Sequence, residues 1–239
     1  MISEMELLKG KPIDLGVCKV YPLTLNEIVD MTEEKYNQAL SLITFNKDRL
    51  QINDEELNKL TDYEILLAYC YHQSDFRELF FESVETFLKE PIHLHELGFF
   101  YLGDLEEQRI IDENVLKQIQ EVIRKQNFLS TEKTEFKPAN DKAAELIEKI
   151  KKVKEKLAKQ NSRDNELNLS DIVSIVACYS DGINMFNVWD LTIYQLYITY
   201  MRLIMWDEYH TKYILLPHVT DSTSLDLKHW ATKINLNKK

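Results

Sequence analysis

Residues 188–206 read VWDLTIYQLYITYMRLIMW and form the most apolar stretch of the chain. Thr192 and Gln195 have the spacing of a capping box, in which each side chain bonds the backbone N–H of the other residue, so we expect a helix from about Ile193. Its polar stripe is narrow and consists of Gln195, Thr199 and Arg202. A helix that is apolar nearly all round is buried by more than one neighbour. The stretch therefore predicts a packed helical unit in the C-terminal part of the chain.

Two apolar faces run along this expected helix. One face comprises Ile193, Leu196, Tyr197, Tyr200, Leu203 and Ile204, and the other comprises Tyr194, Ile198, Met201 and Met205. Tyrosine and methionine are adaptable residues that are common at binding surfaces. The neighbour that covers these faces is either another helix of the same domain or another chain, and the sequence leaves both readings open. Our candidate partner-binding residues are Tyr194, Ile198, Met201, Met205, Trp206, Trp189 and Trp230.

Glycine and proline are scarce over the whole chain, with five of each in 239 residues. Average usage, about 12% for the two together, corresponds to close to thirty residues. A β-sandwich or barrel needs a turn every ~8–12 residues, so the scarcity argues against those folds. It also argues against Gly-rich nucleotide-binding loops. Long helices need few turns, and the composition therefore favours a mainly α protein.

Two short extended elements are expected in the N-terminal half. Pro12–Pro22 indicates a hairpin that turns at Gly16. Ile92–Gly103 indicates a second hairpin, which returns through 109–111. Thr24 and Glu27 have capping-box spacing before a helix expected around Leu25–Met31, and a second helix is expected to start at Thr32-Glu33-Glu34 and to lead into Tyr36, Leu40 and Ile43. Further helices are expected over Ile65–Tyr71, over Phe76–Leu88 and over Asp112–Gln126. The predicted fold class is mainly α (α+β), a helical protein with a small β-hairpin element or two in its N-terminal half.

The chain divides into three predicted regions. Residues 1–129 form an α+β domain, 130–165 a charged helical connector, and 166–239 an aromatic-rich helical domain. The connector has apolar residues at alternating three- and four-residue steps, the seam of a short coiled coil. Within it, residues 137–163 carry nine basic and four acidic residues. A solvated linker helix, a partner-docking helix and a nucleic-acid contact are the alternatives for this segment.

The whole chain is acidic, with 40 Asp and Glu against 29 Lys and Arg, a net charge of −11. Such a chain has little long-range attraction for nucleic acid or for anionic membranes. Its three cysteines lie far apart without CxxC spacing, which favours free thiols in a reducing compartment. The N-terminus lacks the pattern of a signal peptide, and charged residues interrupt the apolar stretch. We therefore expect a cytoplasmic protein with neither nucleic acid nor membrane as a partner.

Catalytic motifs are not recognisable in the sequence. His93 and His95 alternate along an expected strand beside Glu96, so both imidazoles could face one metal ion. No third ligand follows at a familiar spacing, and ordinary strand histidines are the alternative reading. We predict no catalytic residue, no metal and no cofactor, and a protein that is not an enzyme; a metal-dependent enzyme at these histidines stays the minor alternative.

Several segments resemble a group of bacteriophage proteins. They are Trp189–Tyr197 (WDLTIYQLY), Leu225–Trp230 (LDLKHW), Val20–Ile28 (VYPLTLNEI), the helix around Tyr36, and Ile110–Gln120 (IIDENVLKQIQ). The chain resembles tail morphogenesis proteins, often described as tail assembly chaperone-like, of phages of low-GC Gram-positive bacteria. The resemblance touches most of the chain through loose patterns. The chain is longer than many simple tail chaperones.

This resemblance implies a non-enzymatic assembly factor in the cytoplasm of the bacterial host. Its partners would be the phage tape measure protein, which a tail assembly chaperone keeps soluble, and the tail tube protein, which polymerises around it. A homo-oligomer is a further expectation. The alternative is a structural virion protein of the baseplate or connector.

Overall fold

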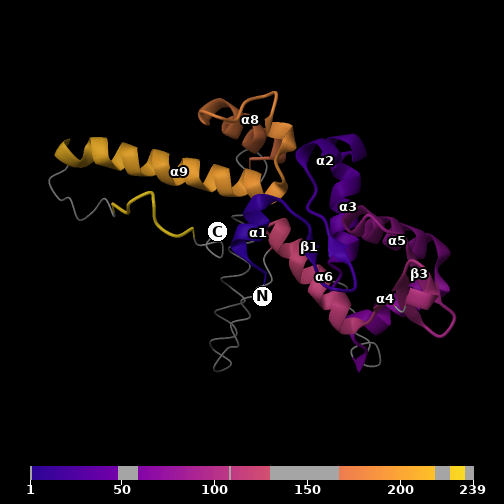
Figure 1. Ribbon diagram of the computed structural model, residues 1–239. Helices are drawn as coiled ribbons and strands as arrows, with labels where there is room; N and C mark the ends of the chain where they lie inside the picture. Colours follow the sequence, from indigo (N-terminus) through magenta and orange to yellow (C-terminus); the bar gives the residue numbers. More distant parts are fainter. Residues whose placement is uncertain (1, 48–58, 108, 130–166, 219–226, 235–239) are drawn as a thin grey trace, which may run out of the picture.

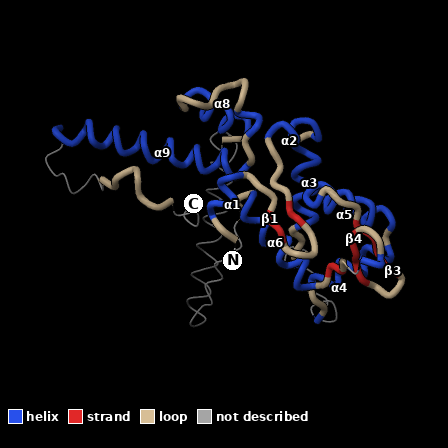
Figure 2. Tube along the Cα trace, in the orientation of Figure 1, coloured by secondary structure: helices blue, strands red, loops and turns tan. Residues whose placement is uncertain are grey.

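The computed structural model describes residues 2–47, 59–107, 109–129, 167–218 and 227–234. The predicted connector, 130–165, lies outside these ranges. Within them the chain forms eight α-helices and two small antiparallel sheets (Figures 1 and 2). The mainly α fold class, with its small β elements in the N-terminal half, is therefore confirmed.

The elements follow one another in a simple order. The helices are α1 (Glu4–Lys9), α2 (Leu25–Met31), α3 (Glu33–Ile43), α4 (Asp62–His72), α5 (Ser74–Leu88), α6 (Glu113–Gln126), α8 (Leu169–Tyr179) and α9 (Ile193–Leu215). The strands are β1 (Ile13–Asp14), β2 (Lys19–Val20), β3 (Ile92–His95), β4 (Phe99–Leu102) and β5 (Ile110–Ile111). Short 3₁₀ turns, η3 (Leu105–Glu107), η4 (Val188–Asp190) and η5 (Leu216–His218), complete the list. Among the described residues, none of the helices combines the length and the apolar character that a membrane span requires.

Capping boxes fix where several helices begin. At α2 the Thr24 hydroxyl accepts the backbone N–H of Glu27 at 3.3 Å, and the Glu27 carboxylate accepts the N–H of Thr24 at 2.8 Å. These bonds satisfy donors that the first turn of a helix leaves without a partner. The same arrangement begins α1 at Ser3, α4 at Thr61, α8 at Asn168 and α9 at Thr192. The expected starts of α2 and α9 are thus confirmed to the residue.

Both expected hairpins are present. In the first, β1 pairs with β2, and Gly16 turns with a φ of 83° while its N–H bonds the Asp14 carboxylate at 2.8 Å. In the second, β3 pairs with β4 so that His93 lies opposite Tyr101 and His95 opposite Phe99. Strand β5 then adds to β4 as the third strand of this sheet.

One cluster of buried side chains holds the described elements together. Its largest fully buried members in the N-terminal half are Phe80, Phe87 and Phe100, beside the apolar face of α6. The same cluster includes residues of the C-terminal half, namely Ile172, Val173, Val176, Val188, Ile193 and Leu196. The two halves therefore share a core, while the predicted division into domains stays a prediction.

A backbone junction joins the two halves beside this core. The N–H of Leu25 donates to the carbonyl of Leu191 at 2.9 Å, and Thr24 and Thr192 form an antiparallel bridge. The caps of α2 and α9 thus lie side by side. The Gln195 amide also donates to the carbonyl of Leu8 at 2.8 Å, which ties α1 to the first turn of α9.

Candidate functional site: the exposed arm of α9

Helix α9 begins inside the core and then leaves it. Its first turn is buried at Ile193, Tyr194 and Leu196. Figure 1 shows the rest of the helix extending away from the other elements. At 1.5 Å per residue, 23 residues span about 34 Å, far more than the first turn needs for packing. We call residues 201–215 the arm.

The arm carries apolar side chains that nothing else in the described residues buries. Ile204, Trp206, Tyr213, Ile214 and Leu215 are exposed, and the exposed fraction reaches 68% at Ile214. These residues lie on more than one side of the helix, because successive side chains are rotated by about 100°. Solvated helices normally keep their exposed side polar. The arm is therefore an apolar surface of the type that binds another chain.

The predicted site residues divide between core and surface. Tyr194 is only 3% exposed and stacks on Phe128, with ring centroids 4.9 Å apart. Burial raises the pKa of its phenol, and the negative charge of Glu4 raises it further. Tyr194 is therefore a core side chain in this structure and is not accessible to a partner. The physical reason is that α9 starts between α6 and α8, so its first turn is enclosed on both apolar faces.

The other predicted residues are less buried than Tyr194. Ile198, Met201 and Met205 are half-buried on the second face, and Trp206 and Trp230 are exposed. Trp189 is half-buried in η4, where its indole N–H donates to the carbonyl of Met185 at 2.8 Å. Whether these six residues bind a partner stays a prediction.

Six aromatic rings form a continuous surface on the arm. We call them the aromatic patch: Trp206, Tyr209, His210, Tyr213, His229 and Trp230. Ring centroids are 4.2 Å apart between Trp206 and His210, and 5.0 Å apart between Tyr209 and His229. Aromatic residues supply large contact area and are enriched where binding energy concentrates in interfaces.

A return segment, residues 227–234, brings the last part of the patch to the arm. One guanidinium nitrogen of Arg202, Nη1, donates to the carbonyls of Trp230 at 2.9 Å and Thr232 at 2.6 Å. These bonds hold the segment against the side of α9 that carries Tyr209. Trp206 and Trp230, both predicted from the sequence, are thereby joined through the rings between them.

Four members of the aromatic patch were missed by the sequence analysis. Tyr209, His210 and Tyr213 continue the three- and four-residue spacing beyond Trp206, and this signal was available. His229 reaches the patch only through the return segment. Helical spacing does not encode that contact, so the sequence carries no comparable signal for it.

Charge contributes little to the surface of the arm. Glu208 and Lys212 form an exposed ion pair at i,i+4 spacing, with 2.5 Å between carboxylate and ammonium. Such exposed pairs are worth roughly 0–1 kcal/mol. Arg202 and Asp207 are the other two charged residues of the arm, so its four charges sum to zero and contacts made by this surface depend mainly on apolar and aromatic area.

The histidines of β3 are engaged with neighbouring rings. His95 stacks on Phe99 at 4.5 Å between centroids, and His93 lies 5.2 Å from Tyr101. The Nδ1 atom of His95 also accepts the backbone N–H of Leu97 at 3.1 Å. Over the ranges that the structure describes, no group of three or more His, Cys, Asp or Glu side chains is placed to hold a metal ion.

The C-terminal region also has a counterpart among known families. Residues 158–235 match the family model of the YomV second domain. This match spans α8, η4, α9 and the return segment, and so includes the whole aromatic patch. The family is phage-associated, of the Bacillus phage SPBeta type, and the match suggests a phage protein. None of the curated proteins and none of the solved structures compared with the chain matches it.

Proposed function

We propose that this chain is a non-enzymatic phage tail morphogenesis factor, acting as a tail assembly chaperone. Its partners would be the tape measure protein and the tail tube protein of the same phage. The observation that supports this proposal is the arm of α9, an apolar helical surface whose aromatic patch has four exposed and two half-buried members within the described residues. The match to a phage-associated domain over the same residues supports the phage context.

The chemistry of the arm suits a helical apolar client. Amphipathic helices bind by laying an apolar face against another apolar surface, with anchors spaced at three and four residues. Trp206, Tyr209 and Tyr213 have this spacing along one side of α9. A tape measure protein exposes long apolar helices before tail tube subunits surround it, and the arm would cover part of that surface. The net charge of −11 would keep the complex soluble through repulsion between copies.

Co-expression with the tape measure protein of the same phage tests this proposal. We expect the soluble amount of tape measure protein to rise several-fold when this chain is present. Tyr213→Glu combined with Trp206→Glu should abolish the rise, because a charge placed in an apolar contact must lose its hydration. If the tape measure protein stays equally insoluble with and without the chain, the chaperone role is wrong.

A matched control distinguishes binding through the arm from non-specific association of exposed apolar side chains. Tyr71 of α4 and Tyr213 of the arm are each 59% exposed. Tyr71→Glu therefore makes the same chemical change at the same exposure on a different surface. We expect Tyr71→Glu to support solubility as the unaltered chain does. Equal loss in both variants would remove the arm as the binding surface.

Purified virions distinguish a chaperone from a structural component. A chaperone is released before the tail is complete, so mass spectrometry should detect no stoichiometric amount of this chain in virions. A stoichiometric amount would instead support the baseplate or connector alternative. Metal analysis of the purified chain and of His93→Ala tests the remaining enzymatic alternative.

A further inference from the structure

The loop between α8 and η4 presents a single large apolar side chain to solvent. Phe186 is 96% exposed, the highest value of any large apolar residue in the described part of the chain. A side chain this exposed makes almost no contribution to the core. We call residues 180–187 the Phe186 loop.

Hydrogen bonds hold this loop in one shape. The side chain of Asn184 accepts the N–H of Phe186 at 2.9 Å, and the side chain of Asn187 accepts the N–H of Asn184 at 2.7 Å. Asn187 also donates to the carbonyl of Gly182 at 3.0 Å. A rigid loop loses little conformational freedom on binding, which is the property of a preorganised anchor.

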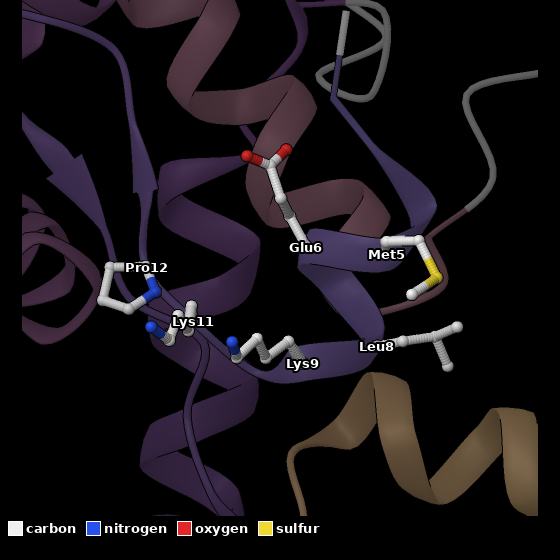
Figure 3. A pocket seen from close by; sticks show the side chains of 6 residues that line it. All are labelled: Met5, Glu6, Leu8, Lys9, Lys11 and Pro12. Atoms are coloured by element: carbon white, nitrogen blue, oxygen red, sulfur yellow. The ribbon is translucent and has the colours of Figure 1, made fainter.

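A hollow on the other side of α9 from the Phe186 loop has an apolar lining that could receive an apolar ring. It lies over α1 and the residues after it, has a volume of about 490 Å³, and is lined by Met5, Glu6, Leu8, Lys9, Lys11 and Pro12 (Figure 3). Its apolar members are Met5, Leu8 and Pro12, and Met5 and Leu8 are exposed. The volume is ample for a phenyl ring.

The charges around the two features are complementary. Asp181 lies within the Phe186 loop and Asp190 follows it, whereas Lys9 and Lys11 border the hollow. These four side chains are exposed and form no ion pairs within the described residues. The one acidic residue of the hollow, Glu6, is turned to its own helix cap, where its carboxylate accepts the N–H of Ser3 at 3.2 Å. The flank of the loop is thus acidic and the border of the hollow basic, so the two surfaces have opposite charges.

We infer that the Phe186 loop of one copy of this chain inserts into the α1 hollow of a second copy. The loop follows α8 and the hollow lies over α1, and in Figure 1 these two helices are on opposite sides of the beginning of α9. A contact between two different surfaces is heterologous, and it joins copies head to tail. A single ring with two charge pairs buries less area than a standard interface, so this association is weak and depends on concentration.

Sedimentation velocity of the full chain, from micromolar to submillimolar concentration, tests this inference. The average sedimentation coefficient should rise with concentration. Phe186→Ser and Leu8→Asp should each weaken the association about tenfold or more, as expected for loss of a central anchor or its pocket. Leu97→Ser, which removes an 81% exposed apolar side chain from the β3–β4 turn, should leave the association unchanged.

Mixing the two interface variants gives a sharper result. Phe186→Ser retains an intact hollow, and Leu8→Asp retains an intact loop. Each variant alone should associate about tenfold more weakly than the unaltered chain, while the mixture should form one-to-one dimers and nothing longer. Asp181→Lys should weaken the association of the otherwise unaltered chain, and adding Lys11→Glu to it should restore the association.

Three results would overturn the inference. They are a chain that stays monomeric at every concentration, an association that Phe186→Ser leaves intact, and a variant mixture that stays monomeric. Thermal melts of all variants, compared with that of Leu97→Ser, ensure that the differences arise in folded protein. Association that is lost in Trp206→Glu but kept in Phe186→Ser would assign self-contact to the arm instead.

Discussion

The three cysteine side chains differ sharply in their surroundings. Burial raises the pKa of Cys18 to about 11, with the charge of Glu90 adding to the effect, and burial raises the pKa of Cys70 to about 12. Both thiols therefore stay protonated at neutral pH, and the thiolate is the reactive form. Cys178 is exposed at the end of α8.

We expect one thiol per chain to react quickly with a maleimide or an aromatic disulfide reagent under native conditions. The other two should react only after denaturation. Cys178→Ser should remove the fast reaction and leave the slow pair. Two or more fast thiols in the native chain would contradict the burial of Cys18 and Cys70.

Two aromatic residues of α9, one buried and one exposed, should differ strongly in how much the same substitution lowers the free energy of unfolding. Tyr194→Glu places an unpaired carboxylate in the core and removes the stacking on Phe128, so we expect a loss of about 3 kcal/mol or more in the free energy of unfolding. Trp206→Glu changes an exposed position and should alter that free energy by about 0.5 kcal/mol or less. Urea denaturation of both variants provides the measurement. Equal stability of the two variants would mean that α9 does not enter the core as the structure has it.

The site was only partly predictable at this scale. Spacing along 188–206 correctly grouped the residues that share a face of α9. It left open whether another helix of the same chain or a partner covers each face, and the structure shows that the chain's own core encloses Tyr194. Which neighbour covers a face depends on contacts distant in sequence, such as the one between Phe128 and Tyr194.

At the scale of single elements, the cap of α2 links helix formation to pH. Burial alone would raise the pKa of Glu27, but the N–H of Thr24 and the ammonium of Lys89, 2.9 Å away, outweigh it and lower the pKa. Since the folded pKa lies below the ordinary carboxyl value of 4.5, this contribution to stability is present above 4.5 and is lost as the pH falls through the folded value.

Glu27→Gln should therefore destabilise the chain at neutral pH but not in acid. We expect a loss of up to ~1 kcal/mol at neutral pH, the magnitude of an exposed ion pair, and a difference that vanishes well below pH 4.5. Urea midpoints at the two pH values measure it. Glu85→Gln, on α5 and without an ion pair among the described residues, is the control and should show no such pH dependence. A Glu27→Gln effect that grows in acid would reverse the assigned sign.

Elements were the most predictable level of the structure. Thr24-x-x-Glu27 and Thr192-x-x-Gln195 marked helix starts, because a capping box satisfies backbone donors locally. The two hairpins followed from glycines at turns with positive φ. Helix α1 was overlooked although Ser3-x-x-Glu6 has the same spacing; at six residues it is too short to show a clear apolar period.

At the scale of the whole molecule, the scarcity of glycine and proline predicted the fold class, since long helices need few turns. Composition could not predict the shared core. Val188 and Leu196 pack in one cluster with Val20 and Ile28, although more than 150 residues separate the two groups along the chain. Only the folded structure reveals pairings at that separation.

The junction between Leu25 and Leu191 is part of a noncovalent interface between the two halves of the chain. Residues 1–129 and 167–239 meet through hydrogen bonds and apolar packing, so their cohesion does not require an intact peptide between them. We expect the two pieces, co-expressed as separate polypeptides, to copurify and to melt as one unit.

Each piece alone should be far less stable, because separation uncovers Leu25 and Ile28 on one side and Ile193 and Leu196 on the other. Calorimetry of the pair and of each piece provides the comparison. If 1–129 alone melts as cooperatively as the pair, the predicted N-terminal domain is an independent folding unit. If instead the pair melts as one unit and neither piece does so alone, proteolytic cleavage of the chain between its two halves leaves the folded structure intact.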